Sequence, residues 1–177
     1  MSTVKVQGNA SGSGSITLAS PNTNSNQTAT LPDRTGNIAM DGPAFSAYQS
    51  SSQSLTGTVW TKLQLQTEEF DTNSNFDNVT NYRFTPTVAG YYQVNGRLQL
   101  QTFVTQVAVD IYKNGSSYKN LQNTSVTTSV FMAGGSALIY LNGSTDYIEL
   151  YGYSSSTANT ANNQTTTYFQ ASMVRAA

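Results

Sequence analysis

The sequence predicts an all-β, antiparallel jelly-roll sandwich that follows a short, strand-poor N-terminal segment. From Tyr92 to Gln101 apolar and polar residues alternate without a break, and side chains on a strand alternate with a period of two. Tight-turn signals, among them Asn114-Gly115 and Asn142-Gly143, separate further apolar stretches. No stretch has a helical period, and many short strands with spaced turns are typical of sandwiches and jelly rolls.

The composition narrows the class of protein. The 177 residues are enough for one domain of ordinary size and an extension. Only 10% of the residues are charged and the formal net charge is −1, so no broad basic surface is expected to hold nucleic acid. This polarity without charge is more typical of an exposed, protease-resistant β-protein than of a cytosolic enzyme. No apolar run of about 18 residues predicts a membrane span.

Two residue types are missing altogether, since the chain has no cysteine and no histidine. The first absence excludes disulfides and thiolate chemistry, and the second removes the commonest metal ligand and general base. Lys5 is followed by no apolar core, so we expect no secretory signal. These features favour a non-enzymatic protein that is made inside a cell and built for an outside environment.

Residues 1–42 differ from the rest of the chain. Three short strand signals, at 16–18, 28–31 and 38–40, alternate with turn-rich runs. Too few large apolar residues are present to form a separate core. We therefore expect this segment to share a core with other chains, and a floppy tail is the alternative. The side chains expected in the shared core are Val4, Ile16, Leu18, Leu31 and Ile38.

Two stretches of this segment carry a resemblance. They read GSITLASPNTNSN at 14–26 and TLPDRTGNIA at 30–39, and they resemble a module that recurs in bacteriophage tail and head fibres. In those proteins the module lies in thin trimeric stalks or in segments that anchor the protein to the virion. The resemblance implies that residues 1–42 form a stalk or an anchor that contacts other virion proteins.

A head domain is predicted over residues 43–177, after the boundary at Asp41-Gly42-Pro43. An acidic loop is expected over residues 68–81, and a loop rich in Ser, Thr and Asn over 154–166. Strands are expected at 44–48, 59–65, 92–101, 107–112, 129–141, 146–151 and 168–175. The predicted core residues are Tyr92, Val94, Leu98, Leu100, Val109, Ile111, Ile148 and Leu150.

The order and spacing of residues in this domain resemble the globular head of complement component 1, q, a tumour-necrosis-factor-like jelly roll. The resemblance is carried by Leu65, Asp71, Phe76, Phe84, Gly90 and Tyr92, with the opening stretch 43–47 and the closing stretch 169–172. Three departures from the family pattern exist. Leu65 replaces Phe, and Val94 and Gly96 replace large aromatics. The gap between Phe76 and Phe84 is seven residues, where the pattern has about six. The resemblance implies a compact homotrimer and leaves the ligand open.

The polar face of the strand at 92–101 carries amides and almost no charge. Uncharged amides suit a hydrogen-bonded contact between identical chains, because a repeated charge would repel itself around the axis. A solvated sheet face is the alternative, since outward polar residues are ordinary in antiparallel sheets. The residues predicted to form the trimer interface are Tyr91, Gln93, Asn95, Arg97, Gln99, Tyr140 and Tyr168. Arg97 is expected to meet an acid or a carbonyl of a neighbouring chain.

The carboxylates allow two kinds of chemistry. The densest group is Glu68, Glu69, Asp71 and Asp77. Two carboxylates about 5 to 10 Å apart can hydrolyse a glycosidic bond, but we expect these acids to cap turns and to keep a strand edge soluble. Asp146 and Glu149, or the loop acids, are a weak candidate for calcium, and no other cofactor is expected.

The sequence therefore predicts a homotrimeric bacteriophage virion fibre, of the tail or the head, that is made in the host cytoplasm. Its jelly-roll head would bind a host-surface glycan or protein without chemistry. Exposed tyrosines near loops suit such recognition, and the candidates are Tyr112, Tyr118, Tyr151 and Tyr153. A purely structural capsid decoration or adaptor fibre is the first alternative. A polysaccharide depolymerase and a cellular surface adhesin are the others.

Overall fold

The computed structural model describes Asn24 and residues 42–177, which form strands and, within that range, no helix. The all-β prediction is confirmed. The strands are β1 (Ala44–Tyr48), β2 (Ser54–Leu55), β3 (Thr61–Lys62), β4 (Thr67–Asp71), β5 (Phe76–Asp77), β6 (Arg83–Phe84), β7 (Ala89–Lys113), β8 (Ser116–Asn142), β9 (Ile148–Ser154), β10 (Ala158–Asn159) and β11 (Tyr168–Ala176). The predicted shared core of the N-terminal segment lies outside the described residues, so the division at residue 42 stays a prediction.

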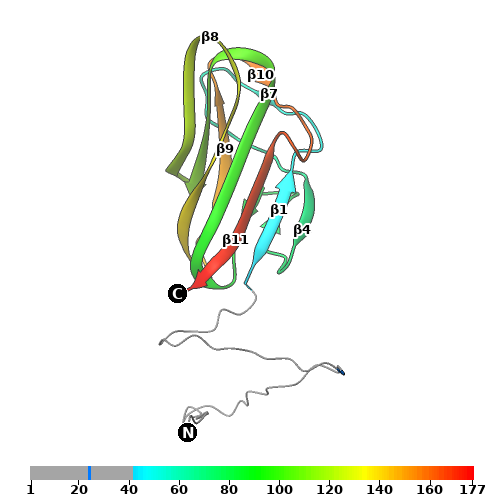
Figure 1. Ribbon diagram of the computed structural model, residues 1–177, viewed down its shortest axis with the longest axis vertical. Coiled ribbons are helices and arrows are strands. Elements are labelled where there is room, and N and C mark those ends of the chain that lie inside the picture. Colours follow the sequence, from blue (N-terminus) through cyan, green and yellow to red (C-terminus); the bar gives the residue numbers. More distant parts are fainter. Residues whose placement is uncertain (1–23, 25–41) are drawn as a thin grey trace. The chain divides into compact units, whose positions relative to one another are not determined.

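Two long strands pass through both layers of the sandwich. The first half of β7 pairs with β11 and with the second half of β8, and β11 pairs with β1, which pairs with β4. These strands form one layer, here called the β11 sheet, and they run side by side in Figure 1. The second half of β7 pairs with the first half of β8 and with β9, which also pairs with β3 and β6. This second layer is called the β9 sheet.

The core lies between these two sheets and follows the alternation along β7. All eight predicted core residues are buried. The sheets approach closely at two glycines: a Cβ on Gly96 would overlap Leu150, and one on Gly152 would lie 2.7 Å from the Leu98 side chain. The small residue on one sheet therefore accommodates the large residue on the other.

An aromatic cluster closes the core beside β1. The ring of Phe45 stacks at 4.6 Å, between centroids, on both Phe76 and Phe84, and Phe169 meets it edge-on. The buried Tyr92 hydroxyl donates a hydrogen bond to the carbonyl of Val88 at 2.6 Å, and burial raises the pKa of Tyr92 to about 12. Three of the residues that carry the family resemblance therefore pack in one place.

The structure corrects the prediction of two separate strands at 92–101 and 107–112. Both belong to β7, because no turn residues lie between them, and the chain crosses from one layer to the other through irregular pairing between Gln99 and Gln106. Residues 107–111 are all buried, since strands flank this half of β7 on both sides and Asp110 is covered as well.

Two further predictions were wrong at the edges of the sheets. The start of the predicted acidic loop is strand β4, which supplies the ladder partner that the edge of β1 would otherwise lack. The predicted strand at 59–65 is reduced to β3, since Leu63 and Leu65 turn into the core after it. Within the described range there is no helix that would cross a bilayer.

Candidate functional site

The outward side of the β11 sheet gathers all seven residues predicted for the trimer interface. Five come from β7, and cross-strand pairing places the other two beside them: Tyr140 of β8 lies opposite Tyr91, and Tyr168 of β11 lies opposite Arg97. All seven are at least partly exposed in the described chain. We call this surface the candidate face. That it forms an interface stays a prediction.

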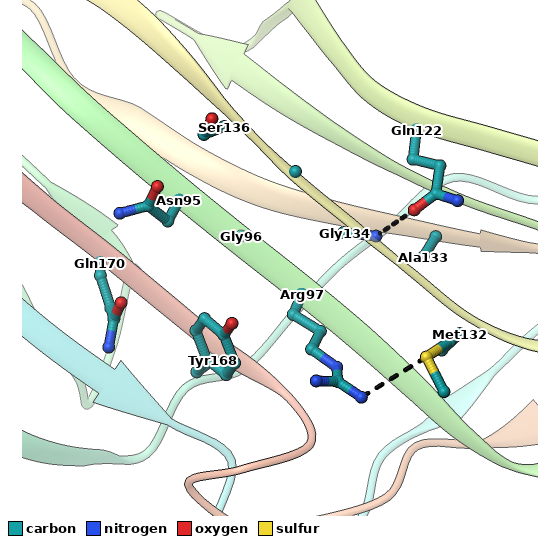
Figure 2. A pocket seen from close by; sticks show the side chains of 11 residues that line it. Asn95, Gly96, Arg97, Gln122, Met132, Ala133, Gly134, Ser136, Tyr168 and Gln170 are labelled. Carbon is teal, nitrogen blue, oxygen red and sulfur yellow. Dashed lines mark hydrogen bonds between the residues drawn. The ribbon is translucent and has the colours of Figure 1, made fainter.

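One half of the candidate face is a polar groove of about 490 Å³. Figure 2 shows Asn95 and Arg97 of β7 between Tyr168 and Gln170 of β11 on one side and side chains of β8 on the other. The Arg97 guanidinium lies 3.4 Å from Gln99 Oε1 and from Met132 Sδ. Among the described residues it forms no ion pair, so this cation has capacity for an additional acceptor.

Apart from Arg175, the other half of the candidate face is apolar. Tyr91 and Tyr140 contact each other with ring centroids 5.5 Å apart, and beside them Leu138 and Val174 are 55% and 53% exposed. These side chains line a hollow of about 690 Å³ together with residues 175–177. Contiguous exposed apolar residues at one place mark an interaction surface.

Sequence reasoning missed the apolar members of this face. Leu138 lies on β8, where apolar residues occupy both sides of the strand, so alternation alone did not show that it points outward. Its position follows from its cross-strand partner, the outward Gln93. Val174 lies at a register irregularity of β11, which no sequence pattern indicates.

Three of the four acids of the predicted excursion bind groups of their own chain. Ser46 donates a hydrogen bond to Glu69 at 2.5 Å, and Asp71 accepts the Phe76 N–H at 2.7 Å. The backbone N–H of Thr80, followed by those of neighbouring residues, lowers the pKa of Asp77 to about 2. Partial burial and the nearby Asp71 raise the pKa of Glu68. These contacts favour the interpretation of the acids as edge and turn residues.

Of the acids considered for calcium, Asp146 and Glu149 each face a lysine. Asp146 binds Lys113 Nζ at 2.8 Å and accepts a hydrogen bond from Asn114 at 2.8 Å, which joins the turn after β8 to the turn after β7. Glu149 binds Lys62 Nζ at 2.5 Å. Within residues 42–177 no three acids gather closely enough to hold a metal ion, and a calcium ion at Asp146 or Glu149 would have to displace a lysine.

The structure brings together three of the four tyrosines proposed for receptor contact. Tyr112 and Tyr151 meet edge-on on the outward side of the β9 sheet, and Tyr153 follows on β9. Trp60, which the sequence pattern assigned to a strand without a role, contacts Tyr153 with ring centroids 5.4 Å apart. Tyr118 is separate from this group and lies against Lys113 and Lys119.

Comparison with known proteins identifies the fold of the described chain. No family model matches the chain, and no curated protein matches it. Among solved structures, the Eiger tumour necrosis factor of S. frugiperda aligns with a TM-score of 0.60 at 8% identity, over 78% of this chain and 96% of that one. The shared feature is the jelly roll. The described chain therefore has the tumour-necrosis-factor-like fold that the sequence predicted.

Two other solved structures extend the comparison. The globular domain of zebrafish complement 1qA aligns with a TM-score of 0.56 at 15% identity, over 76% of this chain and 99% of that one. The vertex protein P5 of the phage PRD1 aligns with a TM-score of 0.52 at 13% identity, over 77% of this chain and 99% of that one. At these identities the likeness is one of fold.

The Asp146–Lys113 pair predicts a pH dependence of stability. The hydrogen bond from Lys113 chiefly lowers the pKa of Asp146 below 3.8, so the pair stabilises the fold above that pH and is lost as the pH falls through the lowered value. In urea unfolding, Asp146→Asn is expected to cost about 1 to 3 kcal/mol at pH 7. Its free energy of unfolding should also fall less between pH 5 and pH 2 than that of the wild type. Parallel pH curves would contradict the assignment.

Proposed function

We propose that this chain is a structural component of a bacteriophage virion, a homotrimeric fibre of the tail or the head. The N-terminal segment fastens the fibre to other virion proteins. The jelly-roll head faces outward and binds the host surface without chemistry. The candidate face is the single observation that carries the trimer. The virion location rests on the resemblance of the N-terminal stretches, on the fold of the head and on the composition.

The candidate face suits a contact between copies of the same chain. Its apolar half exposes Leu138 and Val174, whose burial against a neighbour would contribute free energy. The amides along β7 supply hydrogen bonds without a charge that repeats around an axis. Arg97, unpaired by an acid in the described chain, would then meet an acceptor of the neighbouring protomer.

Three observations support the virion location. The stretches 14–26 and 30–39 resemble a module of phage tail and head fibres. The head has a fold that also occurs in a phage vertex protein. A composition rich in Asn, Gln, Ser and Thr, with only 10% charged residues, suits a protein exposed outside the cell.

The trimer predicts a mass of three chains by light scattering at micromolar concentration. Leu138→Glu would place three like charges at the apolar half of the interface, and such contacts cost several kcal/mol. We therefore expect its trimer to dissociate at concentrations at least about a hundredfold higher than the wild type and to melt at a lower temperature. Val79→Glu, at a loop position that is 74% exposed, is the matched control and should behave as the wild type.

A wild-type monomer at micromolar concentration would refute the trimer. If Leu138→Glu remained as trimeric and as heat-stable as Val79→Glu, the chain would assemble through another surface.

The proposal also predicts that the head leaves the host surface unaltered. Glu69, Asp71 and Asp77 are held by hydrogen bonds of their own chain, and the sequence offers no histidine or cysteine as a base or nucleophile. Incubation with host-surface polysaccharide should release no new reducing ends. Release that disappears in Glu69→Gln would instead establish a depolymerase.

Particles provide the direct test of the location. An antibody raised against residues 43–177 should label projections on intact virions in electron micrographs, and the free trimer should compete with virions for adsorption to host cells. Unlabelled virions would refute the proposal. Labelled virions whose adsorption is unaffected would leave a decoration or adaptor fibre as the function.

A further inference from the structure

A row of side chains crosses the outward side of the β9 sheet. Cross-strand pairing places Asn123 of β8, Ala108 of β7 and Tyr153 of β9 next to one another, and Trp60 extends the row past Tyr153. One step along the strands, Tyr151 and Tyr112 continue the aromatic surface. We call Trp60, Tyr153, Tyr151 and Tyr112 the Trp60 ridge. All four rings are half-buried, so each ring packs partly against the protein and is partly exposed to solvent.

The loop before β3 holds Trp60 in place at a conformational cost. Thr58 has a φ of 63°, which is a true outlier for a β-branched residue. Its N–H donates a hydrogen bond to the carbonyl of Ser154 at 2.7 Å, and a Cβ on Gly57 would lie 2.8 Å from the backbone of Ser156. Tight contact with residues 154–157 thus imposes the strained conformation that places Trp60 beside Tyr153. Strain of this kind gathers at binding sites.

The charges around the ridge are already neutralised or covered. Lys62, the cross-strand partner of Tyr151, and Glu149, the cross-strand partner of Tyr112, bind each other at 2.5 Å. Asp110 is 3% exposed and accepts a hydrogen bond from Ser117 on one oxygen. Its other oxygen has no donor in the described chain but is buried, so a ligand on the surface does not reach it. A ligand of the ridge would therefore gain by supplying apolar surface and would gain little from charge.

We propose that the Trp60 ridge binds an uncharged hexose unit of a host-surface glycan, with the sugar ring stacked on Trp60 and Tyr153. One face of a hexose presents C–H groups to an aromatic ring while its hydroxyls stay available for hydrogen bonds. Asn123 and Gln106, whose amides bind each other at 2.9 Å at the end of the row, offer polar partners for those hydroxyls. This inference rests on the proposed function and names the ligand class of the head.

The position of the ridge is compatible with the proposed trimer. The candidate face is the outward side of the β11 sheet, whereas the ridge is the outward side of the β9 sheet. The core of the sandwich separates the two surfaces. Where the candidate faces of the three protomers meet one another around the axis, the ridge of every protomer stays open to solvent.

Trp60 is the only tryptophan of the chain, so its fluorescence reports directly on the ridge. The full-length protein would be titrated into the millimolar range with the methyl α-glycosides of glucose, galactose and mannose, and with methyl glucuronide as a charged probe. We expect a saturable change with at least one neutral glycoside and a weaker response to the glucuronide. Tyr153→Ala should weaken binding at least tenfold, while Tyr153→Phe, which keeps the ring, should stay within about threefold of the wild type.

Tyr118→Ala is the matched control, because it removes an exposed tyrosine outside the ridge, and it should bind as the wild type. Failure of all three neutral glycosides to give saturation, or equal binding by Tyr153→Ala, would overturn the inference. Adsorption to host cells separates this failure from that of the fibre: if the trimer and its Tyr153→Ala variant adsorb equally, the receptor site lies elsewhere and the fibre proposal stands.

Discussion

The close packing of β7 against β9 is the contact on which the rest of the structure depends. Gly96 on β7 admits Leu150, and Gly152 on β9 admits Leu98, so each sheet supplies the space that the other fills. Larger residues at either glycine would force the layers apart, since protein interiors leave little room for an added methyl group. These two contacts therefore set how closely β7 and β9 approach each other at this point of the core.

Because β7 belongs to both layers, it also links the two surfaces of interest. Its first half presents the amides of the candidate face, and its second half lies beneath the aromatic residues of the Trp60 ridge. One surface is rich in amides, with Arg97 among them and an apolar end, which suits identical partners. The other combines aromatic rings with paired or buried charges, which suits a neutral ligand. The two proposed interactions therefore use opposite sides of one sandwich.

Backbone strain lies at the connections, and one of the two ion pairs of the described chain joins two turns. Thr58 adopts a left-handed conformation just before Trp60, and the Lys113–Asp146 pair joins two turns at one end of the sandwich. Regular strands need no strained backbone, because their backbone hydrogen bonds are satisfied by their neighbours. Loops have no such ladder, and specific side chains hold their conformation instead. Substitutions in these loops are therefore expected to change the position of nearby side chains and the pH dependence of stability more than the fold.

The sequence by itself determined the all-β class, the buried side of β7 and the residues of its outward side, because alternation and turn chemistry are local properties. It also proposed four tyrosines for recognition, and only the structure showed that three of them, Tyr112, Tyr151 and Tyr153, share one surface. Only the tertiary structure decided that residues 89–113 form a single strand, that Leu138 joins the candidate face and that Trp60 meets Tyr153. It likewise decided which acids are paired. These features depend on contacts between residues far apart in the chain, and the period of a single stretch carries no information about its partners.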